Sequence, residues 1–194
     1  MKETFLNALS KPQPIPGGGA AAAYGASVGL ALLEKIVRLE LGRPRNSPER
    51  LSFWKDLLET VCRLSETLLL LREKDGETYL ELVRARASAE HPATVKAALQ
   101  EAVQGPLQIM EAVREGLFCA REARKHCMKH LLSDLLVVVE LLYAAGRGVY
   151  HIAGANLKSG LDVAVFDKYL SDLDGILESS HRVFRETFSD VTTT

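Results

Sequence analysis

Three consecutive glycines, Gly17, Gly18 and Gly19, come directly before an alanine-rich segment in the stretch PIPGGGAAAAYG. The first turn of a helix leaves backbone N–H groups without partners, and the aligned peptide dipoles make that end positive. Because glycines carry no side chain, an anion or a polar heterocycle can approach those donors closely. The pattern predicts a ligand-binding turn; a tight turn made for packing alone is the alternative. No Gly-Lys-Ser/Thr follows, which argues against a Walker-type phosphate loop.

Asp134 is the strongest candidate for proton transfer. Its neighbours at helical spacing are Leu131, Val137, Val138 and Leu141, all apolar, so we expect its carboxylate to face the core or a cleft. Burial raises the pKa of a carboxyl group, which suits general acid–base chemistry near neutral pH. A structural carboxylate satisfied by a neighbouring helix end or an arginine is the alternative.

A third pattern, at the end of REARKHCMKH, places His126 and His130 at i, i+4 with Cys127 between them. Two histidines at this spacing on a helix can hold a metal, but no further ligand stands at a suitable spacing. A basic surface at the carboxyl end of a helix is the favoured interpretation. We therefore expect no metal.

The composition excludes several function classes. The 194 residues contain 24 Lys and Arg against 25 Asp and Glu, so no overall field attracts nucleic acid or an anionic membrane. Three cysteines form no CxxC pair, and the first residues lack the order of a signal peptide. We expect one domain over residues 1–194, in a reduced, cytoplasmic protein.

The elements that must position these residues are all predicted to be helices, because helical periodicity dominates and strand signals are nearly absent. Gly76 and the segments around 42–47 and 89–93 are the expected breaks, and the Gly105–Pro106 pair is expected to kink or split a long helix. Long helices with short connections predict an all-α, up-and-down bundle of antiparallel helices. The expected ranges are about 2–9, 20–41, 48–75, 77–88, 94–125, 130–157 and 162–188.

Two helices have features of their own. Ala22, Gly25, Ala26 and Gly29 share one side of the second helix, which predicts close approach of another helix. The apolar run LLVVVELLYAAG is interrupted by a glutamate. We interpret it as a buried helix, too short and too charged to span a bilayer.

Taken in order, the segments PIPGGGAAAAYGASVG, DGETY, QGPLQIMEAV, LLSDLL and GANLKS resemble the cyclodeaminase/cyclohydrolase family. The likeness covers nearly the whole chain, and its most specific element is Pro-Gly-Gly-Gly before a small-residue helix. The resemblance implies an all-helical homodimer that binds a tetrahydrofolate derivative as substrate. Such enzymes open or close the methenyl ring of the folate, adding water in one reaction and releasing ammonia in the other.

The resemblance also implies site residues. Asp134 is then the catalytic carboxyl, and the remaining matched positions are expected to bind substrate: Gly17, Gly18, Gly19, Asp75, Tyr79, Ser133 and Asn156. The chain departs from the family pattern at Ala20, where a serine is usual, and at Ile152 and Gly154, where an asparagine and an arginine are expected.

The predicted function is therefore that of a formiminotetrahydrofolate cyclodeaminase or methenyltetrahydrofolate cyclohydrolase. A carboxyl group in an apolar cleft serves either reaction, by protonating departing ammonia or by activating water beside a cationic amidine. The alternative is a catalytically degenerate helical dimer that retains the scaffold and a folate-like pocket.

Overall fold

The computed structural model describes residues 4–44, 46–88 and 92–157, together with 171, 175, 178, 179, 181, 182, 185 and 186. Within these residues the regular elements are all helices, which confirms the predicted all-α class for this part of the chain. They are α1 (Phe5–Leu9), α2 (Gly18–Leu41), α3 (Pro48–Ala87), α4 (Pro92–Arg124), the 3-10 helix η1 (Lys129–Leu131) and α5 (Leu132–Leu157). The helix predicted over 162–188 lies mostly outside the described residues.

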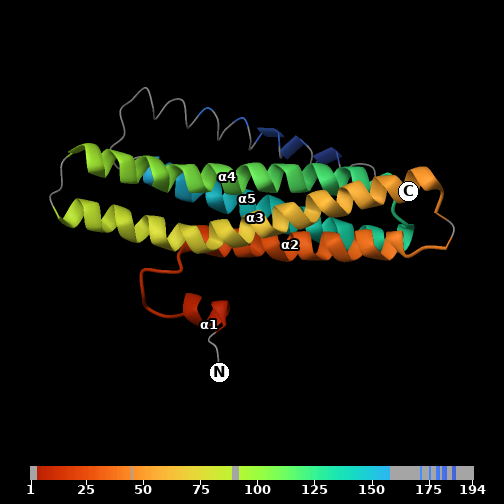
Figure 1. Ribbon diagram of the computed structural model, residues 1–194, viewed down its shortest axis with the longest axis horizontal. Coiled ribbons are helices and arrows are strands. Elements are labelled where there is room, and N and C mark those ends of the chain that lie inside the picture. Colours follow the sequence, from red (N-terminus) through yellow and green to blue (C-terminus); the bar gives the residue numbers. More distant parts are fainter. Residues whose placement is uncertain are drawn as a thin grey trace.

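The long helices α2 to α5 lie alongside one another as a bundle (Figure 1). α2 packs against α3 and α5, and α4 packs against the same two helices from the other side. The short connections make successive helices antiparallel, as the up-and-down prediction requires. α1 stands outside the bundle at the end of an irregular segment (Figure 1).

Local sequence signals set several helix ends. The Ser47 hydroxyl accepts a hydrogen bond from the backbone N–H of Arg50 at 3.3 Å, and Pro48 occupies the first helical position. α2 ends at Gly42, whose N–H donates to the carbonyl of Arg38 at 3.1 Å. These are the N-cap and the helix terminator that the sequence predicts.

The break predicted at Gly76 is wrong. α3 continues through this residue to Ala87, and Gly76 is buried beneath the side chain of Ile15. The split predicted at Pro106 does not occur either, since α4 runs from Pro92 to Arg124. A glycine costs a helix only about 1 kcal/mol relative to alanine, which burial of the surrounding apolar face offsets.

The small-residue side of α2 allows close packing at one position. A side chain at Gly29 would meet Leu141, Leu142 and the carbonyl of Val138 at 3.3–3.4 Å, so α5 approaches α2 closely there. Gly25 has open space instead, with nothing within 4 Å of a Cβ built on it. The prediction of a shared packing face is therefore confirmed at Gly29 and wrong at Gly25 within one chain.

Two helical stretches, Gly18–Leu41 and Lys129–Ala155, have the length and hydropathy of membrane-spanning helices. The second is longer than the apolar run that the sequence analysis considered too short. Each also contributes buried residues to the core of the bundle, as core helices of comparable composition do.

A buried glutamate fixes the far end of α2. Glu40 has no exposed surface, and its carboxylate accepts the backbone N–H of Met128 at 2.9 Å and the guanidinium of Arg43 at 2.6 Å. Met128 lies in the connection between α4 and α5. Glu40 therefore ties α2 to the turn that starts α5.

We predict that Glu40→Ala lowers the free energy of unfolding by about 2–4 kcal/mol, because it removes a buried acceptor and leaves two partly buried donors unpaired. Glu34 is the matched control on the same helix. Its ion pair with Arg38 is largely exposed, so Glu34→Ala should cost less than about 0.5 kcal/mol. Urea denaturation of both variants measures the difference, and equal losses would contradict the role given to Glu40.

Candidate functional site

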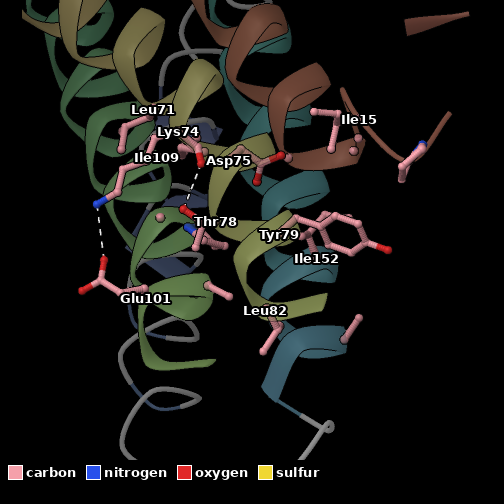
Figure 2. A pocket seen from close by; sticks show the side chains of 18 residues that line it. Ile15, Leu71, Lys74, Asp75, Thr78, Tyr79, Leu82, Glu101, Ile109 and Ile152 are labelled. Atoms are coloured by element: carbon pink, nitrogen blue, oxygen red, sulfur yellow. Dashed lines mark hydrogen bonds and ion pairs between the residues drawn. The ribbon is translucent and has the colours of Figure 1, made fainter. Parts of the chain in front are cut away.

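A cavity of about 280 Å³ lies where α2 begins and α5 ends. Its walls come from the glycine turn, from α3 and α4, and from the last turns of α5 (Figure 2). Gly17, Gly18, Gly19, Asp75 and Tyr79 all line it. Five of the predicted site residues, from two segments that are distant in sequence, are therefore brought together.

The Asp75 carboxylate sits at the start of α2. Its Oδ2 accepts the backbone N–H of Ala20 at 2.9 Å, so an acid from α3 caps a helix whose own N-cap, Gly17, offers no side chain. A Cβ on Gly19 would lie 2.2 Å from Oδ1 of Asp75. A side chain at position 19 would therefore have to displace the Asp75 carboxylate, which occupies that space.

Burial raises the pKa of the Asp75 carboxyl above its ordinary value of 3.8, and the hydrogen bond from Ala20 opposes this shift. The aliphatic side chains of Ile15, Leu71, Ile109 and Ile152 form much of the surrounding wall. This environment is the apolar cleft that the sequence analysis assigned to Asp134.

Further donors stand beside this carboxylate. No described residue accepts a hydrogen bond from the backbone N–H of Gly18 or Gly19, and both glycines line the cavity. The N–H groups of a first turn point out of the amino-terminal end of a helix, where its dipole is positive. A ligand can therefore find an acceptor and backbone donors within one turn of α2.

The irregular segment before α2 closes one side of the cavity. Pro14 and Ile15 line it, and Ile15 lies over Gly76 of α3. α1 holds this segment in place through aromatic contacts, since the Phe5 ring lies 4.7 Å from that of Tyr24. The Arg72 guanidinium stands 5.3 Å from the Phe5 ring.

Asp134 and Ser133 lie elsewhere. The Asp134 side chain is 42% exposed, and its carboxylate lies 3.8 Å from the ammonium of Lys35. Lys35 and Ala20 are about 22 Å apart along α2 at 1.5 Å per residue. Ser133 is exposed at the start of α5, and neither residue lines the cavity. The prediction that the Asp134 carboxylate faces the core or a cleft is therefore wrong within one chain. Because α5 runs antiparallel to α2, Asp134 also lies far from the glycine turn.

The departures from the family pattern differ in their consequences. Ala20 is buried outside the cavity wall and contributes its backbone N–H. Ile152 lines the cavity and packs against Gly18, where it makes the wall apolar. Gly154 has open space around it. The side chain of Asn156, a predicted binding residue, lies outside the described part of the structure.

The two histidines are not arranged as metal ligands on one helix. α4 ends at Arg124, so His126 lies in the following turn and His130 in η1. The ring of His126 packs against Phe53, with 4.6 Å between centroids. Over the described residues, no three His, Cys, Asp or Glu side chains come together as a candidate metal site.

Sequence reasoning missed three polar contributors to the cavity: Lys74, Thr78 and Glu101. It also missed the contact between Asp75 and the glycine turn. One signal was available, because a helix that starts at glycine has no N-cap side chain of its own and needs an acceptor from another element.

The helical bundle with its cavity at the start of a glycine-led helix is of the cyclodeaminase type. Its fold matches the crystal structure of formiminotetrahydrofolate cyclodeaminase from Thermotoga maritima with a TM-score of 0.85. That match covers 97% of this chain and 95% of the other, at 19% identity. The formiminotransferase-cyclodeaminase family model matches residues 1–174. The chain therefore belongs to this family, as the sequence resemblance indicated.

Two curated relatives are similar over nearly the whole chain. The methenyltetrahydrofolate cyclohydrolase of Methylorubrum extorquens strain AM1 is 28% identical over 183 residues, which are 90% of this chain and 88% of that protein. The mouse formimidoyltransferase-cyclodeaminase is 25% identical over 185 residues. This chain spans only 34% of the mouse protein.

We predict that Gly19→Ala destabilises the protein by about 1–3 kcal/mol, because the added methyl group must displace the Asp75 carboxylate from its cap. Gly17→Ala is the control, since a Cβ there meets only the Pro14 carbonyl at 3.8 Å. Denaturant unfolding compares the two. A Gly19→Ala protein as stable as Gly17→Ala would show that the carboxylate does not need this space.

The raised pKa of Asp75 also predicts a pH dependence of stability. Between the ordinary value of 3.8 and the higher folded pKa, the folded protein holds the proton more tightly than the unfolded chain. The contribution of the Asp75 carboxyl group to the free energy of unfolding is thus fully present below pH 3.8, and it is lost as the pH rises through the folded pKa. Wild type should therefore lose stability relative to Asp75→Asn over this interval, as urea denaturation at a series of pH values can measure. If the free energy of unfolding changed with pH in the same way for both proteins, the raised pKa of Asp75 would be contradicted.

Proposed function

We propose that this protein is a folate-dependent one-carbon enzyme that opens or closes the methenyl ring of a tetrahydrofolate derivative. The proposal is supported by family membership and by the names of its relatives, a methenyltetrahydrofolate cyclohydrolase and a formimidoyltransferase-cyclodeaminase. The substrate would bind in the cavity at the start of α2, with its one-carbon unit beside Asp75. We further propose that the enzyme acts in the cytoplasm.

The observation that carries this proposal is the Asp75 carboxyl group. It lies in a largely apolar cavity, burial raises its pKa, and a hydrogen bond from Ala20 fixes its orientation. A general acid or base near neutral pH needs this combination of a shifted pKa and a fixed position. We therefore assign to Asp75 the proton transfer that the sequence analysis gave to Asp134.

In the hydrolytic direction, the Asp75 carboxylate takes a proton from a water molecule whose oxygen adds to the methenyl carbon. Its negative charge also stabilises the cationic amidine in the approach to this step. One carbon–nitrogen bond of the ring then breaks, and Asp75 returns the proton to the departing nitrogen. In the deaminating direction, the second ring nitrogen adds to the formimino carbon and loses its proton. The protonated carboxyl group then donates its proton to the amino group, whose carbon–nitrogen bond breaks so that it leaves as ammonia.

The remaining cavity residues would bind the ring system. The backbone N–H groups of Gly18 and Gly19 can donate to a carbonyl or ring nitrogen, and Tyr79, which is 46% exposed, can stack on an aromatic portion. Ile152 replaces the amide expected from the family pattern. At this end of the cavity the chain therefore relies on Asp75 and the glycine turn for its polar contacts.

A homodimer is part of this proposal, and it offers the one route by which Asp134 could contribute. On one chain Asp134 is remote from the cavity, so it could act only by reaching the cavity of a second chain. The exposed apolar side chains Val28 and Val137, on the two helices that carry Lys35 and Asp134, support such pairing.

The rival function, a helical dimer that binds folate without turnover, is favoured by the apolar Ile152 in the cavity wall. It predicts folate binding with no change in the absorbance of the methenyl chromophore.

We predict that Asp75→Asn lowers turnover of 5,10-methenyltetrahydrofolate, or of the formimino substrate, by at least about 100-fold, because the amide at this position cannot carry the proton. Asp134→Asn should change turnover by less than about fivefold. The assay follows the methenyl absorbance, with ammonia release for the formimino substrate, and circular dichroism confirms that both variants fold.

The paired variants separate the possibilities. Loss of turnover in Asp134→Asn together with a near-normal Asp75→Asn would return the catalytic role to Asp134. If wild type turned over neither substrate, the rival function, a helical dimer without catalytic activity, would be favoured.

A further inference from the structure

An exposed, charged part of the cavity wall, formed by Lys74 and Glu101, lies on the side away from Asp75, and we call it the mouth. Lys74 follows Leu71 by one helical turn on α3 and meets Glu101 of α4, with 3.3 Å between the ammonium nitrogen and the carboxylate oxygen. Figure 2 shows this pair on one side of α3 and the Asp75 side chain on the other, towards Ile15. The mouth and the reacting end of the cavity are therefore chemically distinct.

Lys74 is distinguished by its charge. Among the described residues that line the cavity it is the one cation, while Asp75 and Glu101 are the acids. Lys74 is therefore the cationic side chain that a ligand carboxylate can meet here, and the other donors, the N–H groups of the glycine turn, lie beside the Asp75 carboxylate. A ligand carboxylate is repelled from the Asp75 end, where a second negative charge would lie in an apolar environment.

The size of the cavity requires part of an extended ligand to lie outside it. Its volume of about 280 Å³ falls below the range of about 300–1,000 Å³ that encloses a drug-sized ligand. A folate joins a ring system to a benzoyl group and a glutamate tail. With the ring beside Asp75, the tail must extend towards solvent.

The ion pair at the mouth can be opened at small cost. The Lys74 side chain is 54% exposed and that of Glu101 is 60% exposed. Exposed pairs of this kind contribute only about 0–1 kcal/mol, so a ligand carboxylate can compete with Glu101 for the ammonium. Glu101 then weakens tail binding, since it occupies the same donor and repels the same charge.

We propose that Lys74 is a specificity-determining residue that selects folates with an anionic tail, and that Glu101 tunes this selection by competing for the Lys74 ammonium. This inference rests on the proposed function, because it assumes a folate in the cavity. It assigns tail recognition to α3 and α4 at the cavity mouth. The basic segment REARKHCMKH, at the other end of the bundle, has no part in it.

The test compares two substrates: methenyltetrahydrofolate, and the methenyltetrahydropteroate analogue that lacks glutamate. Lys74→Gln should raise the KM for the glutamate-bearing substrate about two- to fivefold, the factor expected for one exposed ion pair, and leave kcat unchanged. Glu101→Gln should lower that KM by a similar factor. Neither variant should change the KM for the analogue, and added salt should reduce both effects.

Lys55→Gln is the matched control. Lys55 is an exposed lysine on the same helix, roughly 28 Å from Lys74 at 1.5 Å per residue, so it changes the net charge equally without touching the cavity. Its kinetic constants should equal those of wild type.

Each outcome decides one claim. If Lys74→Gln raises KM equally for both substrates, or for neither, Lys74 does not select the tail and the inference fails while the proposed function stands. If wild type neither binds nor turns over either substrate, as shown by calorimetry and absorbance, the proposed function fails and this inference with it.

Discussion

The hydrogen bond between the Asp75 carboxylate and the backbone N–H of Ala20 is the contact on which the cavity depends. It joins the middle of α3 to the first turn of α2, and it supplies the cap that Gly17 lacks. Because the carboxylate occupies the place of a side chain at position 19, glycine is the residue that leaves this contact undisturbed. One contact thus explains a glycine, fixes a helix end and orients a carboxyl group of raised pKa.

Other contacts in the bundle hold α2 in the position that this hydrogen bond needs. At its far end α2 is tied by Glu40 to the turn before α5, and near its middle Gly29 lets α5 approach closely. The antiparallel return of α5 then brings Ile152 against Gly18. Both ends of α2 are therefore held by a carboxylate, and the space between α2, α3, α4 and α5 at the glycine end is left as the cavity.

The fold could be predicted from the sequence in most respects, because helical periodicity and the Ser47-Pro48 cap are local signals. Local signals failed at Gly76, where burial under Ile15 overrides the helix-breaking tendency of glycine. The site was predicted in part. The glycine turn, Asp75 and Tyr79 do meet, but the apolar stripe around Asp134 did not reveal that this residue lies beside Lys35. Pairing between helices distant in sequence is not encoded in a single periodic pattern.

The chain shares the fold of its family but lacks several of the polar groups that the family pattern leads one to expect. The chemistry proposed for Asp75 does not need those groups. A carboxyl group, two backbone donors and an apolar wall are sufficient for proton transfer at a cationic carbon. The most direct measurement is a crystal structure with a bound 5-formyltetrahydrofolate. The account predicts the one-carbon unit within hydrogen-bond distance of the Asp75 carboxylate; a folate bound beside Asp134, with the cavity empty, would contradict it.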